Sequence, residues 1–274
     1  MTERFADLLE LTRIGHEGDD VFEAPEHRHG ARLFGGHVAA LALRAAAATV
    51  ASNRSAHALH AFYVRAGRSD VPIHLAVDRV RDGRSFSVRQ VRVSQHGDEI
   101  LHMSASFQVP EHEEDWQAAP GLPPVDHPDP EVAPPGRWLE VHPVLGAFEI
   151  RFAMDTPPGE EERVYPMWVK ARERLPDDPV VHACVMTSIC DVWIGATAAG
   201  RRPTIPKGSA RASLDHSVWL HRAARADEWL LLSVEAVSTI AHRTLGVGSL
   251  QSLDGRLLAT VAQEVIAKDA GRTS

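Results

Sequence analysis

An internal repeat constrains the fold of this chain more than any other feature of its sequence. Each half carries an apolar helix, then a strand opened by a short histidine motif, then a Gly-centred turn and a last strand, at about 35–109 and 180–268. One helix followed by antiparallel strands is typical of an α+β unit in which the helix packs on the sheet. We therefore expect two copies of one α+β unit.

Three landmark positions of the first copy match positions of the second copy at a nearly constant difference in residue number. The aligned pairs are His37 with Asp191, Ala58 with Ser213, and Ala105 with Gln263. Every one of these positions is polar in the second copy, whereas the first copy has mostly alanine. This asymmetry indicates that one copy serves packing and the other serves chemistry.

Hydrophobic periodicity predicts the elements of both copies. In the first half they are a helix at 3–11, strand and loop at 20–34, a helix at 37–50, and strands at 57–66, 71–80, 85–95 and 100–109. In the second half they are short strands near 138–153 and 164–171, a helix at 180–199, and strands at 211–221, 228–241, 243–252 and 256–268.

A segment rich in proline and acidic residues separates the halves at 110–136. Such a composition cannot build an apolar core and favours a linker. The sequence thus predicts an N-terminal, non-catalytic unit at 1–109, a C-terminal, catalytic unit at 137–268, and a loose tail at 269–274.

Charge and composition exclude several classes of function. The net charge of −8 argues against nucleic acid as a partner, because nucleic-acid binding needs a basic face. No apolar run approaches the roughly 20 residues that span a bilayer, and the N-terminus lacks an apolar signal-peptide core. We therefore expect a cytoplasmic protein without a membrane partner. Its two cysteines, Cys184 and Cys190, are expected to be reduced and buried.

Familiar catalytic motifs are missing from the sequence. It contains no Gly-x-Ser-x-Gly elbow, no P-loop and no Gly-x-Gly-x-x-Gly, which argues against a serine α/β-hydrolase and against these nucleotide-binding motifs. The pairs His27 with His29 and His57 with His60 are candidate metal ligands by spacing. His57 and His60 are three apart near a strand start, which places them on opposite faces, and we predict no metal and no cofactor.

Three polar residues interrupt apolar elements of the second copy. Asp191 lies in an apolar helical stretch, Ser213 begins a strand, and Gln263 lies in the apolar last strand. A buried carboxylate is costly unless it has partners or a chemical role. The Asp191 carboxylate, the Ser213 hydroxyl and the Gln263 amide could converge on one water molecule. The alternative is that Asp191 caps or pairs locally and Gln263 faces solvent.

The ordered set of motifs resembles the acyl-CoA thioesterase II family from about residue 30 to 268. The motifs are Phe34-Gly35-Gly36, His57-Ala58-Leu59-His60 with Arg65-x-Gly67, Arg81-Asp82-Gly83-Arg84-Ser85-Phe86, Met103-Ser104-Ala105-Ser106-Phe107-Gln108, Ser188-Ile189-Cys190-Asp191, Ser213-Leu214-Asp215-His216-Ser217-Val218-Trp219-Leu220-His221-Arg222, Glu228-Trp229-Leu230-Leu231, Asp254-Gly255 and Gln263-Glu264. The resemblance implies a tandem double hotdog, in which each of two helices is wrapped by an antiparallel sheet. It also implies hydrolysis of acyl-CoA without a covalent intermediate, with Asp191, Ser213 and Gln263 as the catalytic trio.

The expected reaction also needs groups that bind the substrate. Backbone N–H groups at Gly35 and Gly36 are expected to face the thioester oxygen, because glycines let a ligand approach the backbone. His37 stands where the family usually has glutamine, and it joins His60 and Arg84 as a candidate substrate-binding residue. The candidates for binding the CoA phosphates are Arg65, Arg84 and Arg222.

Two other functions are compatible with a hotdog fold. An acyl-CoA-binding protein with weak or no hydrolytic activity would keep the fold and lose turnover. A hydratase of the enoyl-CoA type needs a histidine five residues after the aspartate, and here that residue is Ala196. Exposed sheet edges leave the oligomeric state open.

Overall fold

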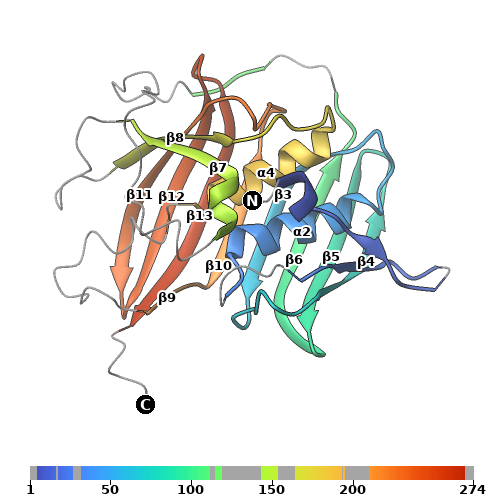
Figure 1. Cartoon of the computed structure of the whole chain (residues 1–274). Helices are drawn as coiled ribbons and strands as arrows, with labels where there is room; N and C mark the ends of the chain where they lie inside the picture. The colour runs from blue at the N-terminus through green and yellow to red at the C-terminus, as the bar shows by residue number, and fades with distance from the viewer. Residues whose placement is uncertain are drawn as a thin grey trace.

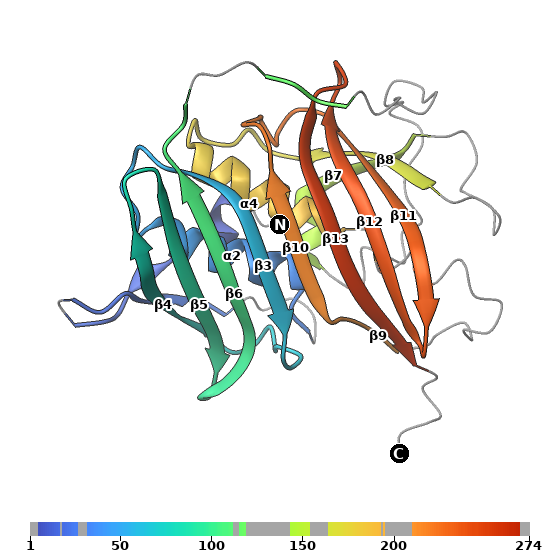
Figure 2. The ribbon, with the colours of Figure 1, turned by 180° about the vertical axis from the view of Figure 1, so that it is seen from behind.

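The computed structural model describes residues 5–16, 18–26, 32–111, 115–118, 143–153, 164–192, 194 and 210–268. These residues form one antiparallel sheet of 13 strands that carries two long helices on one face (Figures 1 and 2). The α+β prediction is therefore confirmed. Most of the predicted linker at 110–136 lies outside the described residues, and so does the whole of the predicted tail at 269–274.

The elements follow the predicted order closely. Those of the first copy are α1 (Phe5–Leu8), β1 (Thr12–Arg13), β2 (Val21–Ala24), α2 (Gly35–Ala47), β3 (Ser55–Tyr63), β4 (Ile73–Asp82), β5 (Phe86–Gln95) and β6 (Asp98–Gln108). Those of the second copy are a 3-10 turn (Pro143–Ala147), β7 (Phe148–Phe152), β8 (Val164–Ala171), α4 (Pro179–Cys190), β9 (Ala210–Ser213), β10 (Asp215–Leu220), β11 (Leu230–Ile240), β12 (Arg243–Ser252) and β13 (Leu257–Lys268).

The strand order shows how the copies are joined. It runs β1-β2-β4-β5-β6-β3-β10-β13-β12-β11-β8-β7, and β9 adds to β13. Reading outwards from the centre, β3-β6-β5-β4 of the first copy matches β10-β13-β12-β11 of the second. The two copies meet at the antiparallel pair β3–β10, where His60 lies opposite Ser217. The repeat therefore produces one continuous sheet whose two halves have the same order.

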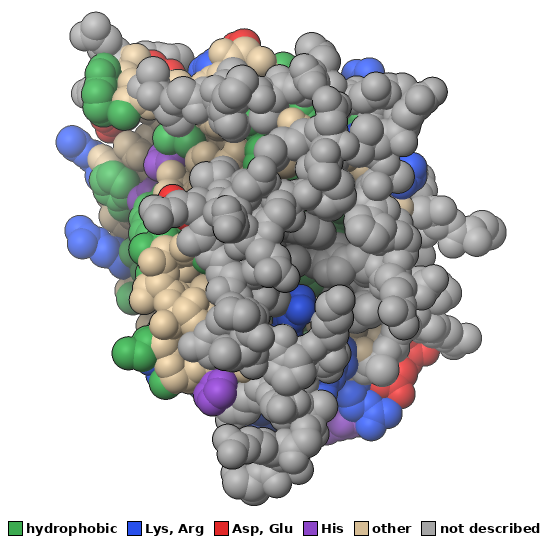
Figure 3. Space-filling model, turned by 90° about the vertical axis from the view of Figure 1, so that its left-hand side faces the viewer, with side chains coloured by type: hydrophobic (Ala, Val, Ile, Leu, Met, Phe, Trp, Pro, Cys, Tyr) green, Lys and Arg blue, Asp and Glu red, His purple; other side chains and the backbone are tan. Residues whose placement is uncertain are grey.

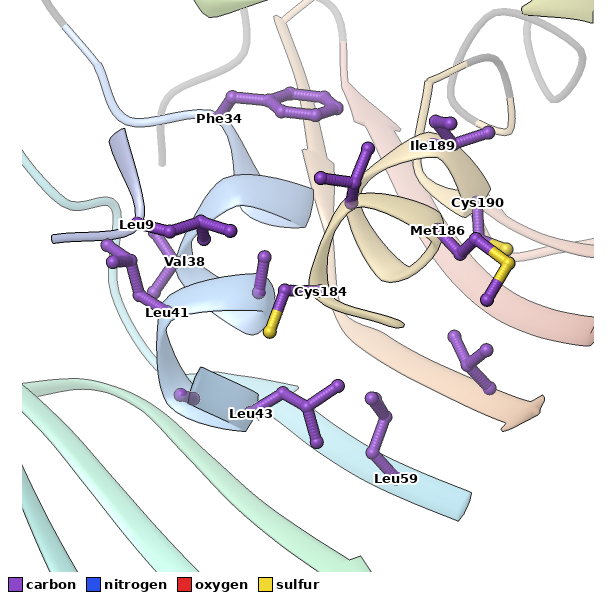
Figure 4. Close-up of a cluster of buried hydrophobic side chains, with 14 of the residues drawn as sticks. Leu9, Phe34, Val38, Leu41, Leu43, Leu59, Cys184, Met186, Ile189 and Cys190 are labelled. Atoms are coloured by element: carbon purple, nitrogen blue, oxygen red, sulfur yellow. The ribbon is translucent and has the colours of Figure 1, made fainter. Parts of the chain in front are cut away.

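The helices α2 and α4 lie side by side on the sheet, and apolar side chains from both fill the space between them (Figure 4). Helix α2 is rich in alanine, and most of these alanines are fully buried, so its partner helix and the sheet can approach closely. Arg44 near the end of α2 pairs with Asp178, the N-cap of α4, at 3.0 Å. The two helices are therefore antiparallel, and the start of α2 meets the end of α4.

This arrangement corrects one part of the predicted repeat. His37 lies in the first turn of α2, whereas Asp191 is the C-cap of α4. They occupy opposite ends of their helices, so the predicted alignment of His37 with Asp191 is wrong. Helix α4 also ends at Cys190, although apolar residues on both sides of Asp191 predicted a helix to 199. The antiparallel packing of the helices, and not the repeat, brings the start of α2 to Asp191 at the end of α4.

The described helices are all too short or too polar to cross a membrane. In the described part of the face shown in Figure 3, the side chains of lysine and arginine lie at several separate places, with acidic and apolar side chains between them. This part of the surface thus carries side chains of both charges, and the whole sequence has 29 Lys and Arg against 37 Asp and Glu.

Candidate active site

Asp191 occupies the junction between the two helix ends. Its side chain is buried, and its Oδ2 accepts a hydrogen bond from the backbone N–H of Gly36 at 2.6 Å. This N–H belongs to the first turn of α2, where backbone donors have no partner within the helix. The positive end of α2 favours a carboxylate here, whereas the negative end of its own helix α4 opposes it. The chain of the first copy therefore helps to hold the carboxylate of the second.

Gln263 connects Asp191 with Ser213. Its side chain is fully buried in β13, and its Nε2 donates to Asp191 Oδ1 at 2.6 Å and to Ser213 Oγ at 2.7 Å. Strand β9 brings Ser213 into reach, because it pairs with Val265, which shares a face of β13 with Gln263. The three residues chosen from the sequence form one hydrogen-bonded cluster. Gln263 does not face solvent, so that alternative fails.

His216 fixes the orientation of the Gln263 amide. It is fully buried in β10, its Nδ1 lies 2.5 Å from Gln263 Oε1, and its Nε2 lies 3.3 Å from the carbonyl oxygen of Thr187. An amide oxygen only accepts hydrogen bonds, so Nδ1 is the donor. With Oε1 occupied by His216, the amide nitrogen faces Asp191. The sequence gave His216 only as part of a family motif, although a histidine at an inward position of an alternating strand was a usable signal.

The glycines at the start of α2 leave no room for a side chain. A Cβ on Gly36 would lie 2.7 Å from the Cβ of Asp191 and 2.8 Å from the carbonyl oxygen of Ser188. A Cβ on Gly35 would lie 2.9 Å from the hydroxyl of Tyr63 and 3.0 Å from Asp191 Oδ2. The Gly-Gly pair is therefore required by the close approach of α4 and β3 to the helix start.

Tyr63 completes the surroundings of the cluster, and the sequence did not predict it. It is the last residue of β3, and its backbone N–H donates to the carbonyl oxygen of Leu214 at 2.9 Å. Burial raises the pKa of its phenol well above the usual value, and the charges of Asp191 and Asp215 raise it further. Tyr63 is therefore a neutral hydroxyl at physiological pH.

The other proposed substrate-binding residues are distributed differently. His37 is buried in the first turn of α2, with its ring edge-on to Phe5. His60 is exposed, and its ring contacts Trp219. Because side chains alternate along β3, Leu59 and Ala61 face the helices and His60 faces away. The structure thus brings His37, but not His60, to the face that carries the cluster.

The three arginines also differ in position. Arg84 follows the end of β4, at the end of the sheet where β3 begins, whereas the cluster lies near Tyr63 at the other end of β3. Arg222 forms a two-pronged ion pair with Asp115 and donates to the carbonyl oxygen of Leu257. Arg65 is exposed two residues after Tyr63. Of the three, Arg65 is the one that directly follows the end of β3, where Tyr63 lies beside the cluster.

The cysteines are not nucleophiles in this structure. Both are fully buried, and burial raises the pKa of each thiol to about 12. Figure 4 shows Cys184 between α2 and α4, and Cys190 on the side of α4 away from α2. Among the described residues there is no group of three or more His, Cys, Asp or Glu side chains that could hold a metal ion.

Comparison with known proteins identifies the family. Residues 24–108 match the family model of the acyl-CoA thioesterase N-terminal domain, and residues 120–267 match that of the C-terminal domain. An acyl-CoA thioesterase II from Mycobacterium marinum is similar in structure, with a TM-score of 0.80 and 32% identity over 97% of this chain and 99% of that one. The chain belongs to the acyl-CoA thioesterase II family.

Other relatives of this thioesterase family member are found in distant organisms. Acyl-CoA thioesterase 2 of Haemophilus influenzae is 31% identical over 96% of this chain and 98% of its own length. Human acyl-coenzyme A thioesterase 8 is 34% identical over 85% of this chain and 79% of its own length. A hotdog-fold protein from Alicyclobacillus acidocaldarius has a TM-score of 0.75 at 21% identity. The predicted hotdog fold is therefore confirmed.

Proposed function

We propose that this chain hydrolyses acyl-CoA thioesters to a free acid and CoA, using a water molecule that Asp191, Ser213 and Gln263 hold and activate. The observation that carries the proposal is the direct link between the three side chains, through hydrogen bonds of 2.6 and 2.7 Å from one amide nitrogen. Family membership supports the reaction, and the geometry supports the roles of the residues.

Asp191 has the position of a general base. Its two carboxylate oxygens are held by different donors, Oδ2 by the N–H of Gly36 and Oδ1 by Gln263. A base held in this way accepts the proton of a water molecule as that water attacks the thioester carbon. General-base catalysis of this kind contributes about 10²–10⁴-fold to a rate.

Ser213 orients the water in this mechanism. Its Oγ accepts a hydrogen bond from Gln263, so its own proton is directed elsewhere and can be donated to the water. The water then has one proton toward Asp191 and a lone pair toward Ser213, which leaves its second lone pair for the carbonyl carbon. Orientation of a reactant contributes to catalysis by reducing the entropy lost in the transition state.

Ser213 lacks the usual activation of a nucleophile. A serine nucleophile needs a base within hydrogen-bonding reach of its hydroxyl. The described partner of Ser213 Oγ is the Gln263 amide nitrogen, which is a donor. The nearby His216 is engaged with the amide oxygen of Gln263 and with Thr187. Direct attack by water therefore fits the site better than an acyl-enzyme.

Thiol release from a series of acyl-CoAs tests the proposed reaction. We expect steady turnover with at least one chain length, and mass spectrometry of protein quenched during turnover should show no acyl group on Ser213. Tight binding of acyl-CoA with no release would instead support the acyl-CoA-binding alternative. An acylated Ser213 that accumulates and decays would contradict direct attack by water.

A further inference from the structure

The hydroxyl of Tyr63 is buried beside the cluster and has no hydrogen-bond partner among the described residues. Building on the proposed function, we propose that this hydroxyl donates a hydrogen bond to the thioester carbonyl oxygen as that oxygen becomes negatively charged. Tyr63 is then a further catalytic residue, contributed by the copy that sequence analysis marked as non-catalytic.

The position of the hydroxyl supports this role. The Tyr63 hydroxyl and Asp191 Oδ2 lie 2.9 and 3.0 Å from the same point, where a side chain on Gly35 would begin. The phenol oxygen and the general base therefore flank the same glycine. The backbone of Tyr63 is held there by its N–H bond to Leu214, the residue next to Ser213. A reacting group beside Gly35 would thus lie close to both the Tyr63 hydroxyl and the Asp191 carboxylate.

The supply of donors at this place is limited. An oxyanion in a buried site needs fixed donors that are in position before the reaction. The N–H of Gly36, which the sequence suggested for this role, already donates to Asp191 at 2.6 Å. The Tyr63 hydroxyl, in contrast, has no hydrogen-bond acceptor among the described residues. A buried hydroxyl without a partner destabilises a fold, and such groups call for an explanation, which a ligand provides.

The protonation state of Tyr63 is the one that this role requires. Burial, Asp191 and Asp215 together raise the pKa of the phenol far above its ordinary value. The hydroxyl therefore keeps its proton throughout the neutral range. A neutral phenol stabilises a growing negative charge by donation, and it adds no negative charge of its own next to the carboxylate of Asp191.

The variant Tyr63→Phe removes this hydroxyl and retains the ring. The matched control is Tyr165→Phe in β8, which removes the only other tyrosine hydroxyl of the chain at a position three strands from β13 in the sheet. We expect kcat of Tyr63→Phe to fall about 10²–10³-fold, the usual effect of removing one oxyanion donor, with little change in KM. The control should keep the wild-type kcat.

Two acyl-CoA analogues separate catalysis from simple packing. A fluoroketone analogue adds water at its carbonyl and imitates the tetrahedral intermediate, whereas an alkyl thioether analogue has no carbonyl oxygen. Because an analogue of the transition state reports the interactions made there, Tyr63→Phe should lose affinity for the fluoroketone by the same factor as kcat/KM. Its affinity for the thioether should equal that of the wild type.

Thermal unfolding supplies the remaining readout. Loss of a hydroxyl without a partner should leave the melting temperature unchanged or raise it. A wild-type kcat in Tyr63→Phe, an equal loss of affinity for both analogues, or a clear drop in melting temperature would each overturn the inference. Failure of the wild type to hydrolyse any acyl-CoA would instead refute the proposed function, and this inference with it.

Discussion

Replacing Gly36 with alanine tests the contact between the two helix ends. A Cβ on residue 36 would lie 2.7 Å from the Cβ of Asp191 and 2.8 Å from the carbonyl oxygen of Ser188. Carbon atoms pack at about 3.5–4.0 Å, so α4 would have to move by roughly 1 Å. Overpacking of this kind costs about 1–3 kcal/mol, and the stiffer unfolded chain offsets about 0.4–1 kcal/mol. A net loss of about 1–2 kcal/mol lowers the melting temperature by roughly 2–8 °C.

The same substitution should reduce turnover. It lengthens the bond from the Gly36 N–H to Asp191, which is 2.6 Å in the native chain, and a displacement of about 1 Å can cost up to about 10²-fold in rate. Gly35→Ala is the matched comparison, because its Cβ would meet the ends of the Tyr63 and Asp191 side chains at 2.9 and 3.0 Å, whereas the Cβ on Gly36 meets backbone at 2.8 Å. Its melting temperature should therefore change less. Melting curves and thiol release measure both effects, and a Gly36→Ala variant that behaves as wild type would refute the described contact.

Three further predictions concern other parts of the molecule. His216→Leu leaves the buried Gln263 amide oxygen without its donor, so kcat should fall by about 10-fold or more. His216→Asn retains a donor and should recover part of this loss of kcat. The two buried thiols, whose pKa is raised to about 12, should resist alkylation at pH 7 until the protein unfolds, and rapid labelling of the native protein would contradict this. The pKa of the Asp20 carboxyl is lowered, first by the hydrogen bond from Arg79, so its charged form stabilises the fold above the ordinary pKa of 3.8 and this stabilisation is lost as the pH falls through the lower folded pKa. The difference in melting temperature between the wild type and Asp20→Asn should therefore shrink on acidification. A difference that grows would contradict the assignment.

Sequence periodicity was sufficient for most of the fold. Alternation of apolar and polar residues located the strands of both copies, since one face of each strand packs on helices and the other does not. Two members of the trio stood out for a related reason, and the family resemblance supplied the complete set. Asp191 and Gln263 interrupt runs of apolar residues, and a polar residue in such a run needs a partner when it is buried.

What the sequence could not show is which elements face each other. The repeat suggested that His37 and Asp191 are equivalent, whereas they lie at opposite ends of their own helices, and antiparallel packing brings the start of α2 to Asp191. Motif membership suggested His60 as a substrate-binding residue, but strand alternation turns it to the outer face. The burial of the Tyr63 hydroxyl depends on Gly35, which is distant in sequence, so no local pattern reveals it.

The central claim is that the carboxylate of Asp191 activates the attacking water, and turnover of Asp191→Asn tests it most directly. The control is Asp178→Asn, the same chemical change at the other end of α4, where asparagine can still cap the helix. We expect Asp191→Asn to fold and to lose at least about 10²-fold in kcat, while Asp178→Asn keeps the wild-type rate. Hydrolysis by folded Asp191→Asn at the wild-type rate would contradict the account.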